Sequence, residues 1–238
     1  MKKIFVLSFV LLFFKTSKSQ ENIWNRNRIS PSLIENFETT KSNKKLKIGE
    51  CFIINSNNRE LARGHFRNGQ KDSIWNFFSQ NGDLIQVYDY TNKVLKYNIP
   101  DEGTIVKERF EVDTAGLVKP KVTRPVKIGG VNYGFYLLYN ERAIPQAAKD
   151  QKEQVLMEYV FDISEIGKME KFSINYISPI YNSENPQSIK GYHPDAYEFI
   201  PATVNGKAVK SKVVYQIVLY INQNRDRGTY NLPTQKNG

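Results

Sequence analysis

The segment from residue 48 to residue 98 restricts the fold most strongly, because short strand-like stretches follow one another with little room between them. Four such stretches are bounded by Gly, Asn or Asp, at residues 50–55, 60–66, 74–79 and 84–90. Connections this short join antiparallel strands, whereas parallel strands need a long crossover. The segment therefore predicts a run of β-hairpins.

Two Asn-Gly pairs, Asn68-Gly69 and Asn81-Gly82, support this prediction. Both central residues of a type I′ turn take positive φ, which Asn and Gly adopt at little steric cost. We therefore expect tight type I′ hairpin turns at both places.

Alternation within the strands predicts one apolar and one solvated sheet face. Asn76 lies between Trp75 and Phe77, and Gln86 lies between Ile85 and Val87. We expect the two polar side chains to lie on the solvated face. Packing in the core is enough to explain why aromatic residues occupy the other positions.

These hairpins resemble a MORN repeat. The matching residues are 64–78, GHFRNGQKDSIWNFF, and 81–85, NGDLI, followed by a partial copy over residues 86–98. Ser73 stands where the family pattern has another glycine. Repeat sheets bury their faces by stacking on neighbours, so the resemblance implies that this module leans on another part of the chain.

A second group of elements begins after a boundary that we place within residues 100–123, which contain one strand candidate at 104–112. Helical spacing of apolar residues predicts a short helix over 131–139, and residues 144–149 predict another helical turn. Two alternating stretches, 155–163 and 169–177, predict a strand pair.

The order of these elements resembles the carboxy-terminal domain of the energy-transducing protein TonB, over about residues 124–222. The matching motifs are Pro125, Gly129-Gly130, Ile144-Pro145 with Ala148, Gly167-Lys168, Pro201-Ala202 and Asn205-Gly206-Lys207. Two features depart from the family. Phe199 stands where tryptophan is frequent, and Pro186, Gly191 and Pro194 interrupt the stretch where the family has a helix, so that helix is expected to be short or missing.

In that family the domain does no covalent chemistry and recognises outer-membrane receptor segments, in part by accepting an extended peptide as an added strand. The resemblance implies a partner-binding strand over residues 213–221, with the candidate residues Val213, Tyr215, Ile217 and Leu219. The alternative, favoured by the apolar character of the stretch, is a central strand that packs into the core.

The residues that carry chemistry in enzymes form no recognisable pattern in this sequence. His65 lies in a hairpin and is expected to be exposed or hydrogen-bonded, as is His193. The sequence contains no metal-ligand spacing, no Gly-x-Ser-x-Gly turn and no phosphate-binding glycine loop. We expect no catalytic residue, no cofactor, no metal and no small-molecule substrate, and His193 and Asp195 with a distant serine form the enzyme alternative.

The amino terminus has the pattern of a secretory signal peptide, with Lys2-Lys3, an apolar run over residues 4–14 and small residues near Ser19. A membrane-spanning helix needs about 20 apolar residues, and this run has eleven. We expect cleavage near Ser19/Gln20 and a periplasmic location. Retention of the segment as an inner-membrane anchor is the alternative.

Composition limits the classes of partner. Cys51 is the only cysteine, so an internal disulfide is excluded, and its apolar neighbours predict a buried, inert thiol. The chain has 34 Lys+Arg and 24 Asp+Glu, and without the four lysines of residues 1–19 the net charge falls to +6. The basic residues are dispersed among acids, so nucleic acid is not an expected partner.

We therefore expect an α+β protein with these parts: a signal peptide over residues 1–19, a loosely ordered lead-in over 20–47, a MORN-like antiparallel hairpin sheet over 48–112, a TonB-like domain with short helices on a small antiparallel sheet over 124–222, and a flexible tail over 223–238. The expected function is non-enzymatic binding of envelope proteins, and homodimerisation through an edge strand is a further hypothesis. Energy transduction with a retained amino-terminal helix and an uncharacterised periplasmic enzyme are the alternatives.

Overall fold

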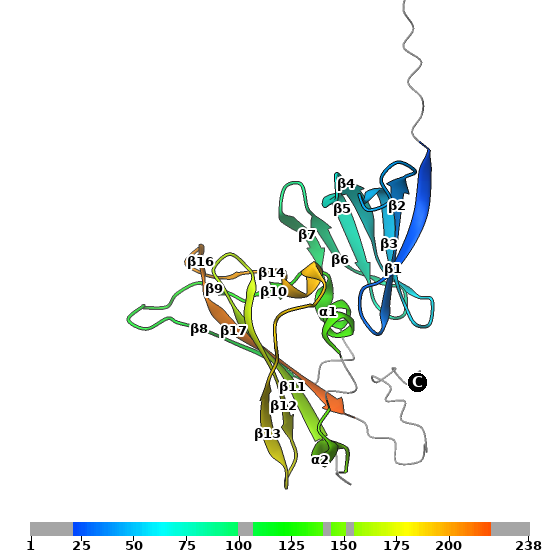
Figure 1. Ribbon diagram of the computed structural model, residues 1–238. Coiled ribbons are helices and arrows are strands. Elements are labelled where there is room, and N and C mark those ends of the chain that lie inside the picture. Colours follow the sequence, from blue (N-terminus) through cyan, green and yellow to red (C-terminus); the bar gives the residue numbers. More distant parts are fainter. Residues whose placement is uncertain (1–20, 100–106, 140–143, 151–154, 220–238) are drawn as a thin grey trace, which may run out of the picture.

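The computed structural model describes residues 21–99, 107–139, 144–150 and 155–219. These residues form two large antiparallel sheets, sheet A and sheet B, on opposite sides of helix α1 (Gly130–Leu138), with smaller two- and three-stranded sheets beside them (Figure 1). The expected signal peptide and tail lie outside the described residues.

Sheet A is a seven-stranded meander in which the spatial order of the strands follows the sequence. Each strand pairs antiparallel with the next one, which confirms the predicted run of hairpins. Its strands are β1 (Asn22–Arg28), β2 (Leu33–Thr40), β3 (Ile48–Asn55), β4 (Glu60–Arg67), β5 (Gln70–Phe78), β6 (Leu84–Asp89) and β7 (Val94–Asn98).

The loosely ordered lead-in predicted for residues 20–47 is wrong, because this segment supplies β1 and β2. Four residues of β2 at every second position are buried: Leu33, Glu35, Phe37 and Thr39. Two of the four are polar, and this made the strand look like a solvated segment in the sequence. The seven-stranded sheet therefore begins more than twenty residues before the predicted start of the MORN-like module.

Only one of the two Asn-Gly pairs forms the predicted type I′ turn. Asn68 and Gly69 both take positive φ, 51° and 79°. At the second pair only Gly82 does so, with φ of 92°, and Ser79 closes the wider turn by donating to the Asp83 carbonyl and accepting from Gly82.

Two residues of the MORN-like stretch have steric roles. Ser73 has a φ of 57°, a conformation in which a side chain is strained and glycine is not. A Cβ atom on Gly64 would lie 2.3 Å from the indole ring of Trp75, which is fully buried and donates to the His65 carbonyl at 3.1 Å. Gly64 is therefore required by close packing on the central tryptophan of sheet A.

Sheet B has five strands in the order β13-β12-β11-β17-β8. The strand pair predicted in the second module is confirmed as β11 and β12. The predicted end of the MORN-like module at residue 112 is wrong, because β8 pairs with β17 in sheet B. The bounds are β8 (Lys107–Val112), β11 (Val155–Ile163), β12 (Met169–Ile177), β13 (Asn182–Pro186) and β17 (Ser211–Leu219).

The remaining elements are short and connect the sheets. The helix predicted over 131–139 is confirmed as α1, and the helical turn at 144–149 is confirmed as α2. The stretch from Pro186 to Pro194, where a helix was expected to be short or missing, begins at the last residue of edge strand β13 and leads into a 3₁₀ helix. The bounds of the short elements are β9 (Val122–Thr123), β10 (Val126–Lys127), α2 (Gln146–Lys149), η2 (Pro194–Tyr197), β14 (Phe199–Ile200), β15 (Ala202–Val204) and β16 (Lys207–Val209).

The predicted α+β class is wrong, since the described residues are 56% strand and only 9% helix, with two α-helices. The helical spacing seen in the sequence was real but short: α1 has nine residues and α2 has four. The polar lead-in supplies two strands where none was expected, and edge strand β13 ends at Pro186, in the stretch where the helix was expected to be short or missing. The protein is predominantly β.

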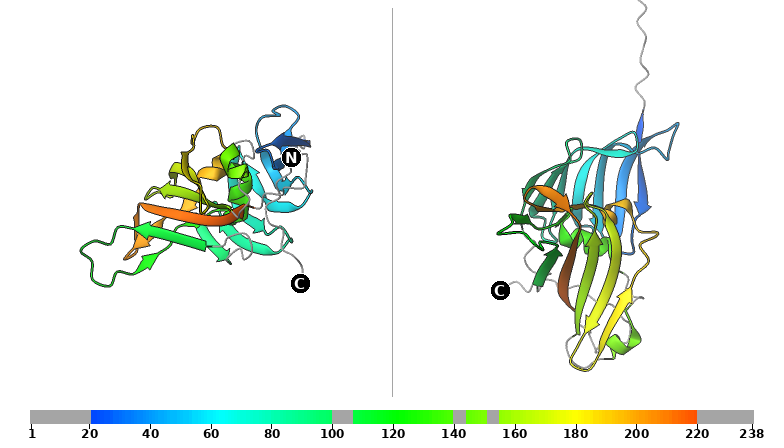
Figure 2. Two further views of the ribbon diagram at one scale, coloured as in Figure 1. Left: turned by 90° about the horizontal axis from the view of Figure 1, so that it is seen from below. Right: turned by 90° about the vertical axis from the view of Figure 1, so that its left-hand side faces the viewer.

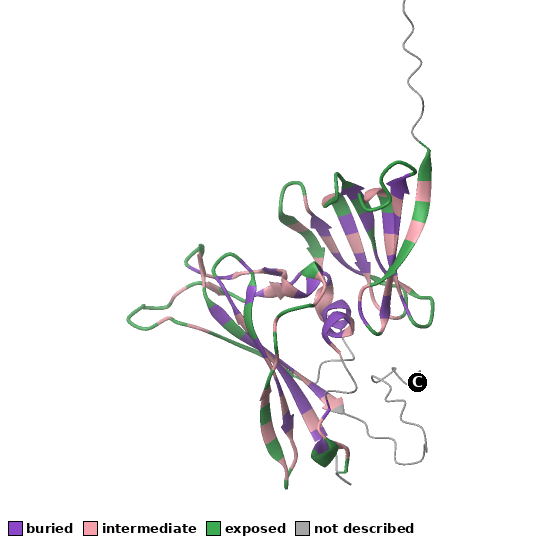
Figure 3. Cartoon of the chain, viewed as in Figure 1, coloured by how far each residue is buried: buried purple, intermediate pink, exposed green. Residues whose placement is uncertain are grey.

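Helix α1 packs against both sheets and unites their cores. Its Tyr133 contacts Phe77 of sheet A at 5.6 Å between ring centroids, and its Phe135 contacts Tyr159 of sheet B at 4.6 Å. The two further views in Figure 2 show the helix between the sheets, and Figure 3 shows buried residues on α1 and on both sheets. The result is one continuous hydrophobic core.

Candidate functional site: an exposed aromatic face and a buried ionic cluster

A cluster of charged side chains is buried where sheet A meets the second domain. Lys71 of β5 and Asp195 of η2 form an ion pair of 2.5 Å, and their side chains are only 8% and 6% exposed. Tyr133 of α1 donates a hydrogen bond of 2.6 Å to the same carboxylate. Three elements that are far apart in the sequence therefore meet at one carboxylate.

The surroundings keep the Asp195 carboxylate ionised. Burial alone raises its pKa, but Lys71, His193 and Tyr133 outweigh burial and hold that pKa well below its usual range. The Lys71 ammonium also lies 4.1 Å from the ring centroid of Trp75, close enough for a cation–π attraction. A buried pair with this many partners is costly to break.

A second buried amine is held by backbone carbonyls. Lys127 of β10 is 3% exposed, and its Nζ donates to the carbonyls of Ile128, Asp195 and Glu198 at 3.0, 2.6 and 2.9 Å. Burial lowers the pKa of Lys127 to about 7, although Asp195 and Glu198 act in the opposite direction. Lys127 thereby ties β10 to the backbone of η2 and to the residue that follows it.

Gln86 is buried in the same interface, so its predicted place on a solvated face is wrong. Its side chain accepts from the Gly129 N–H at 2.6 Å and donates to the Lys127 carbonyl at 3.1 Å and to Asn98 at 2.8 Å. Because these bonds satisfy the amide, the cost of burying it is offset. Asn76, by contrast, is only partly buried.

The predicted inert thiol is confirmed as a buried one. Cys51 is 1% exposed, and burial, together with Glu35, raises the pKa of its thiol far above the usual range. Glu35 is itself fully buried and pairs with Lys47 at 2.5 Å. The Cys51 thiolate, which would be the reactive form, is therefore strongly disfavoured.

The buried cluster has the features of a structural link between sheet A and the second domain, and not those of a catalytic centre. His193 Nδ1 lies 3.6 Å from Asp195 Oδ1 and accepts from the Asp195 N–H at 3.4 Å, but the carboxylate is already taken by Lys71 and Tyr133. A catalytic trio needs access to substrate, and this carboxylate is almost completely covered. His65 is exposed, and among the described residues no group of three His, Cys, Asp or Glu side chains could hold a metal ion.

The four residues predicted to bind a partner lie on β17. Over residues 211–216 this strand pairs with β11 on one side and β8 on the other, so that no edge is open there to an added strand. Val213, Tyr215 and Ile217 are buried, and β17 continues its pairing with β11 up to Leu219. The structure thus places this strand inside the sheet, as in the core alternative.

Sequence reasoning missed an aromatic and basic cluster on the outer face of sheet A. Trp24 of β1 is 50% exposed, and its ring lies 5.4 Å from that of Phe52 on β3. The Arg63 guanidinium of β4 lies 5.6 Å from the centroid of the same Phe52 ring and pairs with the Glu60 carboxylate at 2.6 Å, so the unpaired positive charge of the cluster comes from β1. The sequence signal was present in residues 22–28, NIWNRNR, whose alternation puts an aromatic and two arginines on one face.

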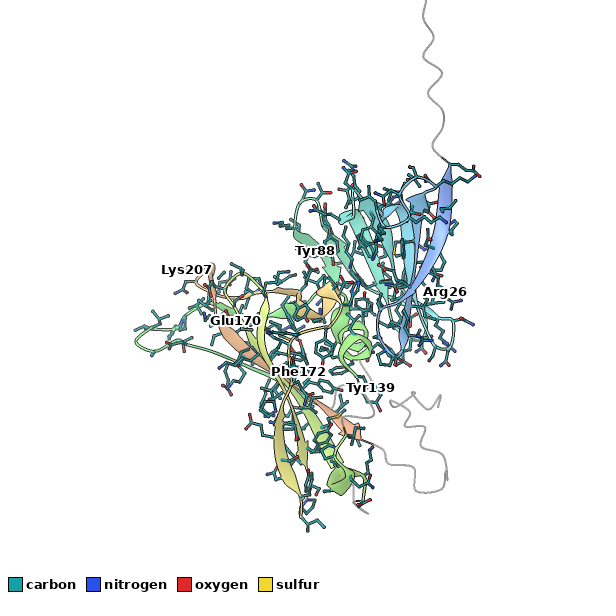
Figure 4. The ribbon with its side chains drawn as sticks, viewed as in Figure 1. Arg26, Tyr88, Tyr139, Glu170, Phe172 and Lys207 are labelled. Carbon is teal, nitrogen blue, oxygen red and sulfur yellow. The ribbon has the colours of Figure 1, made fainter. Side chains whose placement is uncertain are left out.

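Strand β1 is also an open edge of sheet A, because among the described strands only β2 pairs with it. Arg26 and Arg28 are exposed on this edge, and β1 contains no acidic residue. Figure 4 shows Arg26 at the outer border of the sheet. We call this surface the Trp24 face, which consists of Trp24, Arg26, Arg28, Phe52 and Arg63.

Comparison with known proteins gives no family for this chain. No family model matches it, and neither a curated protein nor a solved structure is significantly similar to it. The MORN-like and TonB-like resemblances therefore stay predictions. No helix within the described part of the chain is long and apolar enough to span a membrane.

Proposed function

We propose that this chain is an exported, non-enzymatic protein-interaction protein of the bacterial cell envelope, and that a protein partner binds at the Trp24 face. The observation that carries the proposal is the half-exposed indole of Trp24, packed on Phe52 beside an open strand edge. Tryptophan and arginine are enriched at the energetic centres of protein interfaces, because they bury a large area and still make polar contacts.

The chemistry of the open edge suggests which kind of segment fits. Backbone N–H and C=O groups on the free side of β1 are arranged to pair with an extended peptide. Arg26 and Arg28 add two positive charges to this edge. An extended segment that carries acidic residues is therefore the partner chemistry that we propose.

The buried ionic cluster supports this proposal through rigidity. The Lys71–Asp195 pair and the contacts of Tyr133 fix sheet A against the second domain. A surface that is held in place before binding loses less conformational entropy when a partner docks. The cluster thus contributes to binding at a distance, by holding the Trp24 face still.

Site-specific photo-crosslinking in cells tests the proposal. A photoreactive residue replaces Arg28 at the border of the Trp24 face, where Trp24 and Arg26 stay in place, and a second variant carries it at Lys171, whose side chain is 81% exposed on sheet B. We expect a defined covalent adduct with one envelope protein from position 28 and none from position 171. Trp24→Ala should abolish the adduct, while the matched change Ile180→Ala, at a residue 80% exposed in another part of the chain, should leave it unchanged.

Two results would contradict the proposal. An adduct at position 28 that survives Trp24→Ala would mean that the aromatic cluster is not the binding surface. A chain found only in the cytoplasmic fraction would show that the export part of the proposal is wrong, whatever the adduct.

A further inference from the structure

The segment between β8 and β9, residues 113–121, projects away from both sheets (Figure 1). It carries two neighbouring exposed apolar side chains. Val118 is 91% exposed and Leu117 is 47% exposed. We call this segment the tip loop. Single exposed apolar residues are ordinary on protein surfaces. An adjacent pair at the end of a projecting loop, by contrast, is positioned to contact a partner surface.

Hydrogen bonds at the base of the tip loop fix its position relative to the neighbouring turn. Lys121 and the turn residue Asn205 exchange two hydrogen bonds: the Asn205 N–H donates to the Lys121 carbonyl at 2.7 Å, and the Lys121 N–H donates to the Asn205 side chain at 2.9 Å. Nearer the tip, the Leu117 N–H donates to the Thr114 carbonyl at 3.1 Å. Lys119 takes a φ of 47°, a strained conformation for a residue with a side chain.

Positive charge lies close to the apolar pair. Lys119 and Lys121 follow it on the loop, and Lys207 follows the Asn205-Gly206 turn that forms the base. All three lysines are exposed, and no described acidic side chain pairs with them. Asp113 is the only acidic residue of the loop, and Figure 4 shows Lys207 at the same end of the molecule.

We propose that the tip loop docks on an anionic lipid surface, with Leu117 and Val118 entering the interfacial region and the three lysines facing the headgroups. A specific protein interface buries roughly 800 Å² on each partner, far more than two side chains on a narrow loop present. A membrane surface needs only a few inserted apolar groups together with basic residues, and the two contributions add. The combination at the tip loop therefore fits lipid better than protein.

This surface is separate from the Trp24 face. The tip loop lies beyond sheet B, whereas β1 forms the far border of sheet A (Figure 1). A lipid surface and a protein partner can therefore be bound at the same time. Failure of one proposal leaves the other intact.

A fluorescent label at the tip tests insertion directly. In the full chain, Val118→Cys is labelled with an environment-sensitive nitrobenzoxadiazole group, which reacts selectively because the only native cysteine, Cys51, is 1% exposed. We expect a blue shift and brightening with vesicles that contain phosphatidylglycerol, and neither change with pure phosphatidylcholine vesicles. The control label at Ile180→Cys, also on a highly exposed apolar residue, should show neither change with either vesicle.

Charge variants test the second half of the proposal. Lys121→Gln with Lys207→Gln should weaken the vesicle titration of the label at position 118 on the order of 20-fold, since each lysine near an anionic surface contributes about fivefold. The matched pair Lys44→Gln with Lys45→Gln, which removes two exposed lysines from a loop of sheet A, should leave the titration unchanged.

Three outcomes would overturn the inference. Equal shifts at positions 118 and 180 would mean that insertion occurs elsewhere, for example through the amino-terminal apolar segment. Equal losses from both lysine pairs would mean unspecific attraction by net charge. A shift at position 118 with envelope protein extract but not with vesicles would make the tip loop a protein contact.

Discussion

Lys71 and Asp195, which are 124 residues apart in the chain, form a buried ion pair between sheet A and the 3₁₀ helix η2. Both side chains have further partners, since Tyr133 donates to the carboxylate and the ammonium lies over Trp75. The pair explains how a hairpin sheet with one apolar face is held in a fixed orientation on the second domain.

Asp195→Asn should lower the free energy of unfolding by about 3 kcal/mol, because it leaves the Lys71 ammonium buried without its carboxylate. Urea denaturation measures this change. The double change Lys71→Met with Asp195→Asn should cost less than the sum of the two single changes, since no uncompensated charge remains. Strict additivity would show that the two side chains are not coupled.

The same pair predicts how stability depends on pH. The folded-state pKa of Asp195 lies well below the value of about 3.9 for an unfolded chain. Its contribution is therefore fully present above about pH 5 and is lost as the pH falls through the unfolded pKa towards the folded one. Melting temperatures measured from neutral to acid pH should fall less steeply for Asp195→Asn than for the native chain, and parallel curves would contradict the assignment.

Ser73→Gly should stabilise the protein by about 0.5–1 kcal/mol, because glycine adopts the observed positive φ of 57° without strain. This gain corresponds to a rise in melting temperature of about 1–4 °C for a chain of this size. Scanning calorimetry measures it. Ser73→Ala, which removes the hydroxyl and keeps the strain, is the control and should give no gain.

Gly64→Ala should destabilise sheet A by about 1–3 kcal/mol, because the new Cβ would lie 2.3 Å from the buried indole of Trp75. The near-ultraviolet circular dichroism of Trp75 should change with it. Gly82→Ala is the comparison variant. Nothing lies within 4 Å of that position, so this change tests the backbone strain at a φ of 92° without a steric clash. A wild-type spectrum and stability for Gly64→Ala would mean that the ring can move away at no cost.

The hairpins of sheet A were predictable because they depend on local signals. The alternation around Trp75 and the turn at Asn68-Gly69 are set by a few neighbouring residues, and the structure confirms the predicted strand and the predicted turn. Strand β2 was not predictable in this way, since Glu35 and Thr39 occupy inward positions that alternation would assign to apolar residues. Their burial is compensated by partners elsewhere in the chain, such as Lys47 for Glu35, and a local pattern cannot show such partners.

The candidate sites depended even more on distant contacts. Gln86 looked solvated because its partners Gly129 and Lys127 lie more than forty positions away. The Trp24 face arises only when the four strands β1 to β4 pair in register, which brings Trp24, Phe52 and Arg63 together. Alternation in residues 22–28 could have predicted the strand, but not the ring that Trp24 contacts.

The strand order gives the two sheets different folding histories. Sheet A pairs only strands that are consecutive in the sequence, so its hairpins can close one after another while the chain is still being made. Sheet B cannot do so. Val112 of β8 pairs with Ser211 of β17, and β17, which joins β8 to β11, is the last of the described strands to be synthesised. Contacts of such long range are slow to form. Until β17 is made, one edge of β11 has no paired strand, and an unpaired edge of this kind exposes an unfinished chain to aggregation.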